Sequence, residues 1–173
     1  MSVISKSLLK KCSSFIVEGQ GNFVPTDKFK PGKTEGVKIL KLGDNFRRHF
    51  LGFCQIQDLN ETELSIYQIQ KEFEQRSLVE FIGEASAITV SQFWAVLRTM
   101  SENGCRKELK AISQNNHANI FLVKDGYDMA RLVYGYYSAF GWILSCPPSS
   151  PGKDDWIKYR MVIAKSSKQS NSS

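Results

Sequence analysis

The chain has 173 residues, 42% of them hydrophobic and 23% charged, so it can bury the core of about one domain and is unlike a disordered protein. No stretch approaches the roughly 18 consecutive apolar residues of a membrane-spanning helix. The net charge of +6 is uneven: residues 1–54 contain ten Lys and Arg against four Asp and Glu (+6), residues 55–104 three against eight (−5), and residues 105–173 ten against five (+5).

The first 37 residues predict a short N-terminal helix followed by a basic arm. Ile4, Leu8 and Cys12 recur at helical spacing. Residues 19–36 are rich in Gly, Pro and Lys, a composition typical of a long loop or mobile arm. The segment lacks the charged start and apolar centre of a secretory signal. We therefore expect a cytoplasmic protein, with signal-less export as an effector as the alternative.

Residues 44–73 predict two helices. Asp44 or Asn45 can cap a short helix that continues to residue 51. Asn60 followed by Glu63 resembles a second cap, and the apolar residues in 66–73 fit a helix of three or more turns.

Two more helices are expected before residue 105. Residues 78–82 form an apolar face that should end at Gly83. Thr89 and Gln92 have the spacing of a capping box, which predicts a helix that ends near Gly104.

Beyond residue 104 the apolar period shortens toward two, which is typical of strands. The predicted strands are residues 119–124, 129–137, 142–146 and 156–164. Asp125 is expected to begin a turn, and Gly141 suits a positive φ in the next one. Helices followed by hairpin-connected strands predict an α+β fold, with a helical first half packed on a C-terminal antiparallel sheet of about four strands.

The predicted organisation is an N-terminal helix and basic arm (1–37), a single α+β domain (38–165) and a disordered tail (166–173). The domain segment also carries a resemblance. KILKLGDNF at 38–46, FLG at 50–52, ANIFLVKD at 118–125, RLV at 131–133, the Gly141-Trp142 pair and the basic end at 156–162 resemble a group of short bacterial hypothetical proteins.

That resemblance implies a single bacterial domain and brings no activity, cofactor or site residue with it. The chain departs from the group's pattern at Pro147-Pro148 and at its Val-Ile-Ala ending, where the group has Val-Phe-Ser-Arg-Asn.

Aromatic and basic residues of the C-terminal strands form the candidate binding surface: Arg131, Tyr137, Trp142, Trp156, Lys158 and Arg160. Strand alternation places Arg131 with Tyr137 on one face, and the last three together on one face of the final strand. Helices on one side of the sheet would leave its other side free, and Tyr, Trp and Arg are enriched where proteins bind each other. Packing inside the sheet is the ordinary alternative.

We therefore expect a non-catalytic protein that binds another protein through this sheet. Single-stranded nucleic acid is the alternative partner, because exposed rings can stack on bases while cations follow the phosphates. A basic arm could assist that partner or dock on the acidic middle segment instead; it comprises Lys28, Lys30, Lys33, Arg47 and Arg48.

Catalysis of an unknown type is the weakest alternative. Walker A, H-E-x-x-H and G-x-S-x-G patterns are absent from the sequence. The four cysteines include no C-x-x-C pair, so we expect buried free thiols in a reducing compartment. No metal or other cofactor is predicted.

Overall fold

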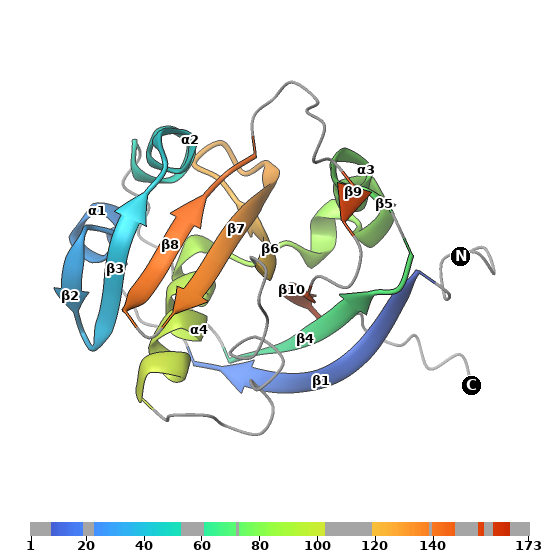
Figure 1. Ribbon diagram of the computed structural model, residues 1–173, viewed down its shortest axis with the longest axis horizontal. Helices are drawn as coiled ribbons and strands as arrows, with labels where there is room; N and C mark the ends of the chain where they lie inside the picture. Colours follow the sequence, from blue (N-terminus) through green and yellow to red (C-terminus); the bar gives the residue numbers. More distant parts are fainter. Residues whose placement is uncertain are drawn as a thin grey trace.

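The computed structural model describes residues 8–18, 23–52, 61–71, 73–102, 119–138, 140–147, 156–157 and 161–166. An eight-stranded mixed sheet organises them, in the order β1-β4-β10-β6-β7-β8-β3-β2 (Figure 1). Its strands are β1 (Leu9–Val17), β2 (Gly32–Thr34), β3 (Val37–Leu42), β4 (Thr62–Ile69), β6 (Asn119–Lys124), β7 (Ala130–Ser138), β8 (Gly141–Ser145) and β10 (Met161–Lys165). A separate two-stranded ribbon pairs β5 (Phe73–Glu74) with β9 (Trp156–Ile157).

Two parallel pairs make the sheet mixed. β6 runs parallel to β10, and β3 runs parallel to β8, whereas the other neighbours are antiparallel. Residues 119–123 of β6 are all buried. A strand buried on both faces needs apolar side chains in both directions, which explains the unbroken run of Ile, Phe, Leu and Val there.

The helices among the described residues are α1 (Pro25–Lys28), α2 (Asp44–Phe46), α3 (Gln75–Ile82) and α4 (Val90–Glu102). A π-helical turn, η2 (Arg47–Leu51), continues α2, and a 3-10 turn, η3 (Glu84–Ser86), follows α3. None of the helices in these described ranges is long and apolar enough to cross a bilayer.

Helix α4 covers one face of the sheet and forms the larger core. Phe93 of α4 packs 4.7 Å, between ring centroids, from Phe121 of β6. Phe29, which follows α1, stacks on Phe93 at 5.7 Å and meets Trp94 edge-on at 5.0 Å. These aromatic contacts fix α4 and the α1 region on the same side of the sheet.

Helix α3 covers only part of the opposite face. Leu78 of α3 joins a second core with Ile120 and Leu122 of β6, Leu132 of β7 and Val162 of β10. In Figure 1, α3 lies with the β5–β9 ribbon at one end of the molecule, whereas β2 and β3 lie at the other end. The face opposite α4 is therefore covered over β10 and β6, whereas no helix of the described residues lies over β8, β3 and β2 on that face.

The predicted fold class is wrong. Instead of a helical first half on a four-stranded C-terminal sheet, strands from the whole chain build one eight-stranded mixed sheet with a few short helices. Separately predicted elements are confirmed: the strand at residues 119–124, the helix after Thr89 and the helix that ends before Gly83.

The two largest errors are helices predicted where strands form. Residues 62–69 form β4, with Leu64 and Ile66 in the α4-side core and Ile69 in the α3-side core. Because β4 is buried on both faces, its apolar residues do not alternate, and such a run imitates helical spacing. Likewise, Cys12 lies within β1 and Leu8 directly precedes that strand, while residue 4 lies outside the described residues.

The segment predicted as a loop or mobile arm is partly built into the core. Residues 25–28 are helical, residues 32–34 form β2, and Phe23 and Phe29 are buried. The Gly, Pro and Lys content hid two aromatic anchors, because composition does not weigh individual large apolar side chains. The proposed division of the chain at residues 37 and 166 stays a prediction.

Candidate binding surface

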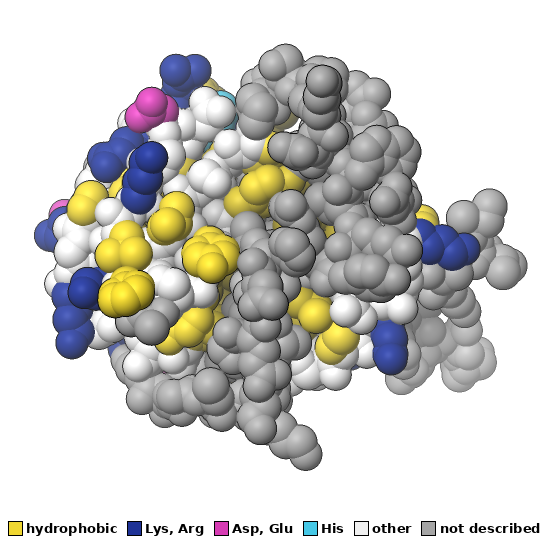
Figure 2. Space-filling model, in the orientation of Figure 1, with side chains coloured by type: hydrophobic (Ala, Val, Ile, Leu, Met, Phe, Trp, Pro, Cys, Tyr) yellow, Lys and Arg dark blue, Asp and Glu magenta, His cyan; other side chains and the backbone are white. Residues whose placement is uncertain are grey.

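The uncovered part of the sheet exposes large apolar side chains. In β3, strand alternation points Val37 and Ile39 into the core and Lys38 and Leu40 outward. In β8, Ile143 points outward between two buried residues. We name the exposed set the apolar patch: Leu40 (41% exposed), Tyr136 (39%), Phe140 (73%) and Ile143 (37%). Figure 2 shows hydrophobic side chains gathered over β3, β8 and β7, with Lys and Arg around them.

Backbone irregularities bring these side chains together. Tyr136 of β7 and Ile143 of β8 are register partners. A register shift in β3 leaves Leu40 and Lys41 both exposed, because two residues there face one on β8. Gly141 has φ 135°, and a Cβ there would lie 2.7 Å from the Lys38 carbonyl oxygen, so the close approach of β3 and β8 requires glycine.

Lysines border the apolar patch on its β2–β3 side. Lys33 and Lys38 are register partners on neighbouring strands, and Lys41 is the partner of Ile143. All three are exposed, and none forms an ion pair with another described residue. Like charges placed opposite each other weaken a sheet, so an anionic partner would remove a repulsion that the free protein retains.

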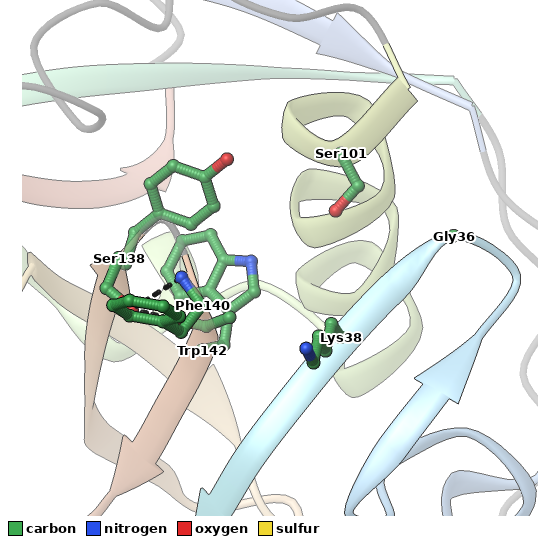
Figure 3. A pocket seen from close by; sticks show the side chains of 8 residues that line it. Gly36, Lys38, Ser101, Ser138, Phe140 and Trp142 are labelled. Carbon is green, nitrogen blue, oxygen red and sulfur yellow. Dashed lines mark hydrogen bonds between the residues drawn. The ribbon is translucent and has the colours of Figure 1, made fainter.

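A small pocket opens where the β7–β8 turn meets β3 and the end of α4 (Figure 3). Its volume is about 140 Å³. We name it the hairpin pocket; its lining consists of Gly36, Lys38, Ser101, Tyr137, Ser138, Phe140, Gly141 and Trp142. Phe140 and Lys38 belong both to this pocket and to the surface around the apolar patch, so the two features are continuous.

Trp142 contributes an unsatisfied donor to the hairpin pocket. The residue is 1% exposed, and its Nε1 atom has no hydrogen-bond partner among the described residues. In Figure 3 the indole nitrogen is turned toward the side of the pocket where Ser101 and Lys38 lie. A buried donor without a partner costs about 1–3 kcal/mol, so this atom is where an acceptor would be bound most favourably.

A second polar cluster lies at the turn between β6 and β7 and stabilises that turn. Asp125 is buried; its Oδ1 accepts the backbone N–H groups of Tyr127 (2.8 Å) and Met129 (3.0 Å), and its Oδ2 accepts Arg131 Nε (2.5 Å). Burial acts to raise the pKa of Asp125, but the hydrogen bonds from Arg131, Met129 and Tyr127 outweigh burial and lower it. The predicted turn at Asp125 is confirmed.

Near this turn, the remaining titratable groups are poorly suited to nucleophilic chemistry. Burial, followed by the charge of Arg131, lowers the pKa of His49. Burial raises the pKa of the Cys146 thiol to about 12, which leaves it protonated at neutral pH. Cys12 is exposed, contrary to the expectation of buried thiols. In the described ranges, no group of three His, Cys, Asp or Glu residues could hold a metal ion.

The structure describes the surroundings of three of the predicted binding-surface residues. Arg131, Tyr137 and Trp142 all lie on the α4 side of the sheet, where Arg131 pairs with Asp125 and Tyr137 packs 4.9 Å from Trp142 between ring centroids. Trp156 belongs to β9, apart from the main sheet. Lys158 and Arg160 lie outside the described residues.

Some residues of the predicted basic arm are bonded within the fold, and others are exposed. Lys28 forms an ion pair with Glu35, and Arg47 Nε donates a 3.4 Å hydrogen bond to the Leu42 carbonyl oxygen. Lys30, Lys33 and Arg48 are exposed. Of the arm, only Lys33 is in β2, next to the lysine of β3 that borders the apolar patch.

The apolar patch itself was missed, although a signal for it exists. Ile143 stands between two buried residues of β8, and Leu40 follows the buried Ile39 of β3, so alternation predicts that both point away from the core. What alternation does not reveal is whether another layer covers that second face, because the position of α3 is set by tertiary packing.

Comparisons with known proteins give no further guidance: no protein-family model, curated protein or solved structure matches the chain. The resemblance to the group of short bacterial proteins therefore stays a prediction.

Proposed function

We propose that this protein acts by binding an acidic protein that places apolar side chains on the apolar patch. The observation that carries the proposal is the set of four large apolar side chains at the β3–β8 end of the sheet, on the face opposite α4, where no helix of the described residues lies. Monomeric proteins rarely leave such side chains contiguous on a regular surface unless a partner covers them. The lysines at the border, which form no ion pair with another described residue, favour an anionic partner.

Protein is favoured over nucleic acid by the chemistry of the patch. Leu40 and Ile143 are aliphatic and present no ring on which a base could stack. They suit the buried centre of a protein interface, and the neighbouring lysines suit its polar rim. Tyr136 and Phe140 are exposed rings, and Phe140 lines the hairpin pocket together with Lys38. Single-stranded nucleic acid is therefore tested as the competing partner.

The test compares the whole immobilised protein with a double variant, Leu40→Ser with Ile143→Ser, in capture from extracts of its native cell. The matched control is Ile16→Ser, which removes a similarly exposed apolar side chain from β1, at the opposite edge of the sheet. We expect an acidic protein to be retained by the wild type and the Ile16 variant and lost with the double variant. Equal capture by all three proteins would refute the proposal.

A salt titration separates the two classes of partner. If a labelled single-stranded oligonucleotide is the partner, the logarithm of its binding constant falls against the logarithm of the salt concentration, with a slope of roughly −0.7 per neutralised phosphate. We expect no binding of the oligonucleotide at low salt. Tight, steeply salt-dependent binding that the double variant abolishes would replace the acidic protein with nucleic acid.

A further inference from the structure

We propose that the hairpin pocket binds a carboxylate group, supplied by an Asp or Glu side chain of the protein that docks on the apolar patch. That a carboxylate binds follows from the pocket alone, whereas its assignment to the partner rests on the proposed function.

The first argument is the unused hydrogen-bond donor. Trp142 Nε1 is buried and unpartnered among the described residues, in a side chain that lines the pocket. In the same molecule, the equally buried Trp94 donates its Nε1–H to Glu35 Oε2 at 3.1 Å. The chain thus already pairs one buried indole with a carboxylate, and Trp142 lacks the corresponding acceptor. Buried donors are almost always paired, which points to an acceptor that arrives with the ligand.

The second argument is charge. Lys38 lines the hairpin pocket, and the described residues of the lining include no Asp or Glu. A neutral carbonyl would satisfy the indole N–H and leave the ammonium group unpaired, whereas a carboxylate can accept from both.

The two serine hydroxyl groups of the rim are already occupied. Ser101 Oγ donates to the Leu97 carbonyl oxygen at 2.9 Å. Ser138 Oγ donates to the Gly141 carbonyl oxygen at 3.1 Å and accepts the Phe140 N–H at 3.2 Å. These bonds hold the turn and the helix end in place. Because Trp142 Nε1 is itself buried, the lining has to open slightly for an acceptor to reach it.

The third argument is size and position. A volume of about 140 Å³ leaves room for a carboxylate group, since the share of one liquid water molecule is roughly 30 Å³. Phe140 and Lys38 connect the pocket to the apolar patch, so one partner can reach both.

The test follows the indole N–H signals in ¹H–¹⁵N spectra of the whole protein while sodium propionate is added. Propionamide, which has nearly the same shape without the charge, is the matched probe, and sodium chloride controls for ionic strength. The Trp142 signal is identified by its loss in Trp142→Phe, or by its contacts with the Tyr137 ring if that variant does not fold.

We expect propionate to move the Trp142 signal downfield in a saturable way, with the Trp94 signal unchanged because its donor is occupied. We also expect the shift to weaken in Lys38→Met. No saturable shift over the solubility range of propionate, or an equal shift with sodium chloride, refutes the carboxylate site.

Capture experiments test the source of the carboxylate. We expect Trp142→Phe to reduce capture of the acidic protein and Trp94→Phe, its buried counterpart, to leave it unchanged. If the Leu40 and Ile143 double variant abolishes capture while propionate leaves Trp142 unmoved, the proposed function stands and the carboxylate site falls. If propionate binds but Trp142→Phe retains full capture, the partner is not the source.

Discussion

The two halves of the sheet contrast in how their faces are covered. Around β6 and β10, α4 packs on one face and α3 on the other, and Ile120, Leu122 and Val162 are buried on the α3 side. Around β8 and β3 the helices of the described residues all pack on the α4 side, and Leu40 and Ile143 occupy the second face exposed to water. Similar aliphatic side chains in one sheet therefore have different surroundings, because α3 packs over only part of the second face.

This contrast separates residues that stabilise the fold from residues that the fold does not need. A side chain buried between two layers gains roughly 25 cal/mol for each Å² of apolar area removed from water. A side chain on the uncovered half gains little of this, so its apolar character calls for another explanation. The same substitution made in each half measures the difference in how much these side chains stabilise the fold.

The largest effect is expected in the doubly covered half. Leu122→Ala empties a site in a central strand between β7 and β10, where neighbouring strands on both sides restrict collapse. We expect the free energy of unfolding to fall by about 3–5 kcal/mol, measured by urea denaturation. A loss below about 1 kcal/mol would mean that the α3-side core is loosely packed and that the contrast between the halves is false.

The next effect concerns the Asp125 turn, which joins β6 to β7 where the two halves meet. Asp125→Asn keeps an acceptor for the two backbone N–H groups but removes the charge that pairs with Arg131. We expect a loss of about 2 kcal/mol. The matched control is Asp128→Asn, since the Asp128 side chain is 81% exposed in its pair with Lys124 and asparagine tolerates its φ of 64°. Equal losses for the two variants would show that the buried pair contributes nothing special.

The same residue sets a pH dependence. Because the pKa of Asp125 is lower in the folded protein, its stabilising contribution is complete above the unfolded value of about 3.9 and is lost as the pH falls through the folded value. We expect wild-type stability to decline more steeply than that of Asp125→Asn below about pH 4. Parallel curves would contradict the assigned pKa direction.

Local signals predicted individual elements well and their assembly badly. The Asp125 turn and the strand at 119–124 depend on neighbouring residues and were predictable. β1 and β4 depend on partners far away in the chain: β4 pairs with residues about 50 positions earlier and about 95 later. Such long-range pairing leaves no local pattern when both faces of the strand are buried.

A third effect tests one of those local signals, the capping box of α4. Thr89 Oγ1 accepts the Gln92 N–H at 3.1 Å, and Gln92 Oε1 accepts the Thr89 N–H at 2.8 Å. We expect Thr89→Ala to cost about 1 kcal/mol. Thr99→Ala, within the same helix, removes only a bond to the Ala95 carbonyl oxygen and should be nearly neutral. A larger loss of stability in Thr99→Ala than in Thr89→Ala would show that the capping box does not stabilise the helix.

The candidate site was the least predictable feature, for a reason that the binding-surface residues make clear. Alternation correctly groups Arg131 with Tyr137 on one face, but it assigns no helix to either face. Trp142 was expected on the free face and lies beneath α4 instead. Which part of the second face stays open depends on where α3 packs, and the sequences of the strands do not encode that position.

The smallest effect on stability is expected on the uncovered half, and it is the most informative. Leu40→Ala makes the same chemical change as Leu122→Ala on a side chain that is 41% exposed, so the free energy of unfolding should change by no more than about 0.5 kcal/mol. If Leu40→Ala nevertheless weakens capture of the acidic partner, leucine at this position serves binding and not folding. A loss of several kcal/mol would instead place Leu40 in the folding core, and the apolar patch would need no partner to account for it.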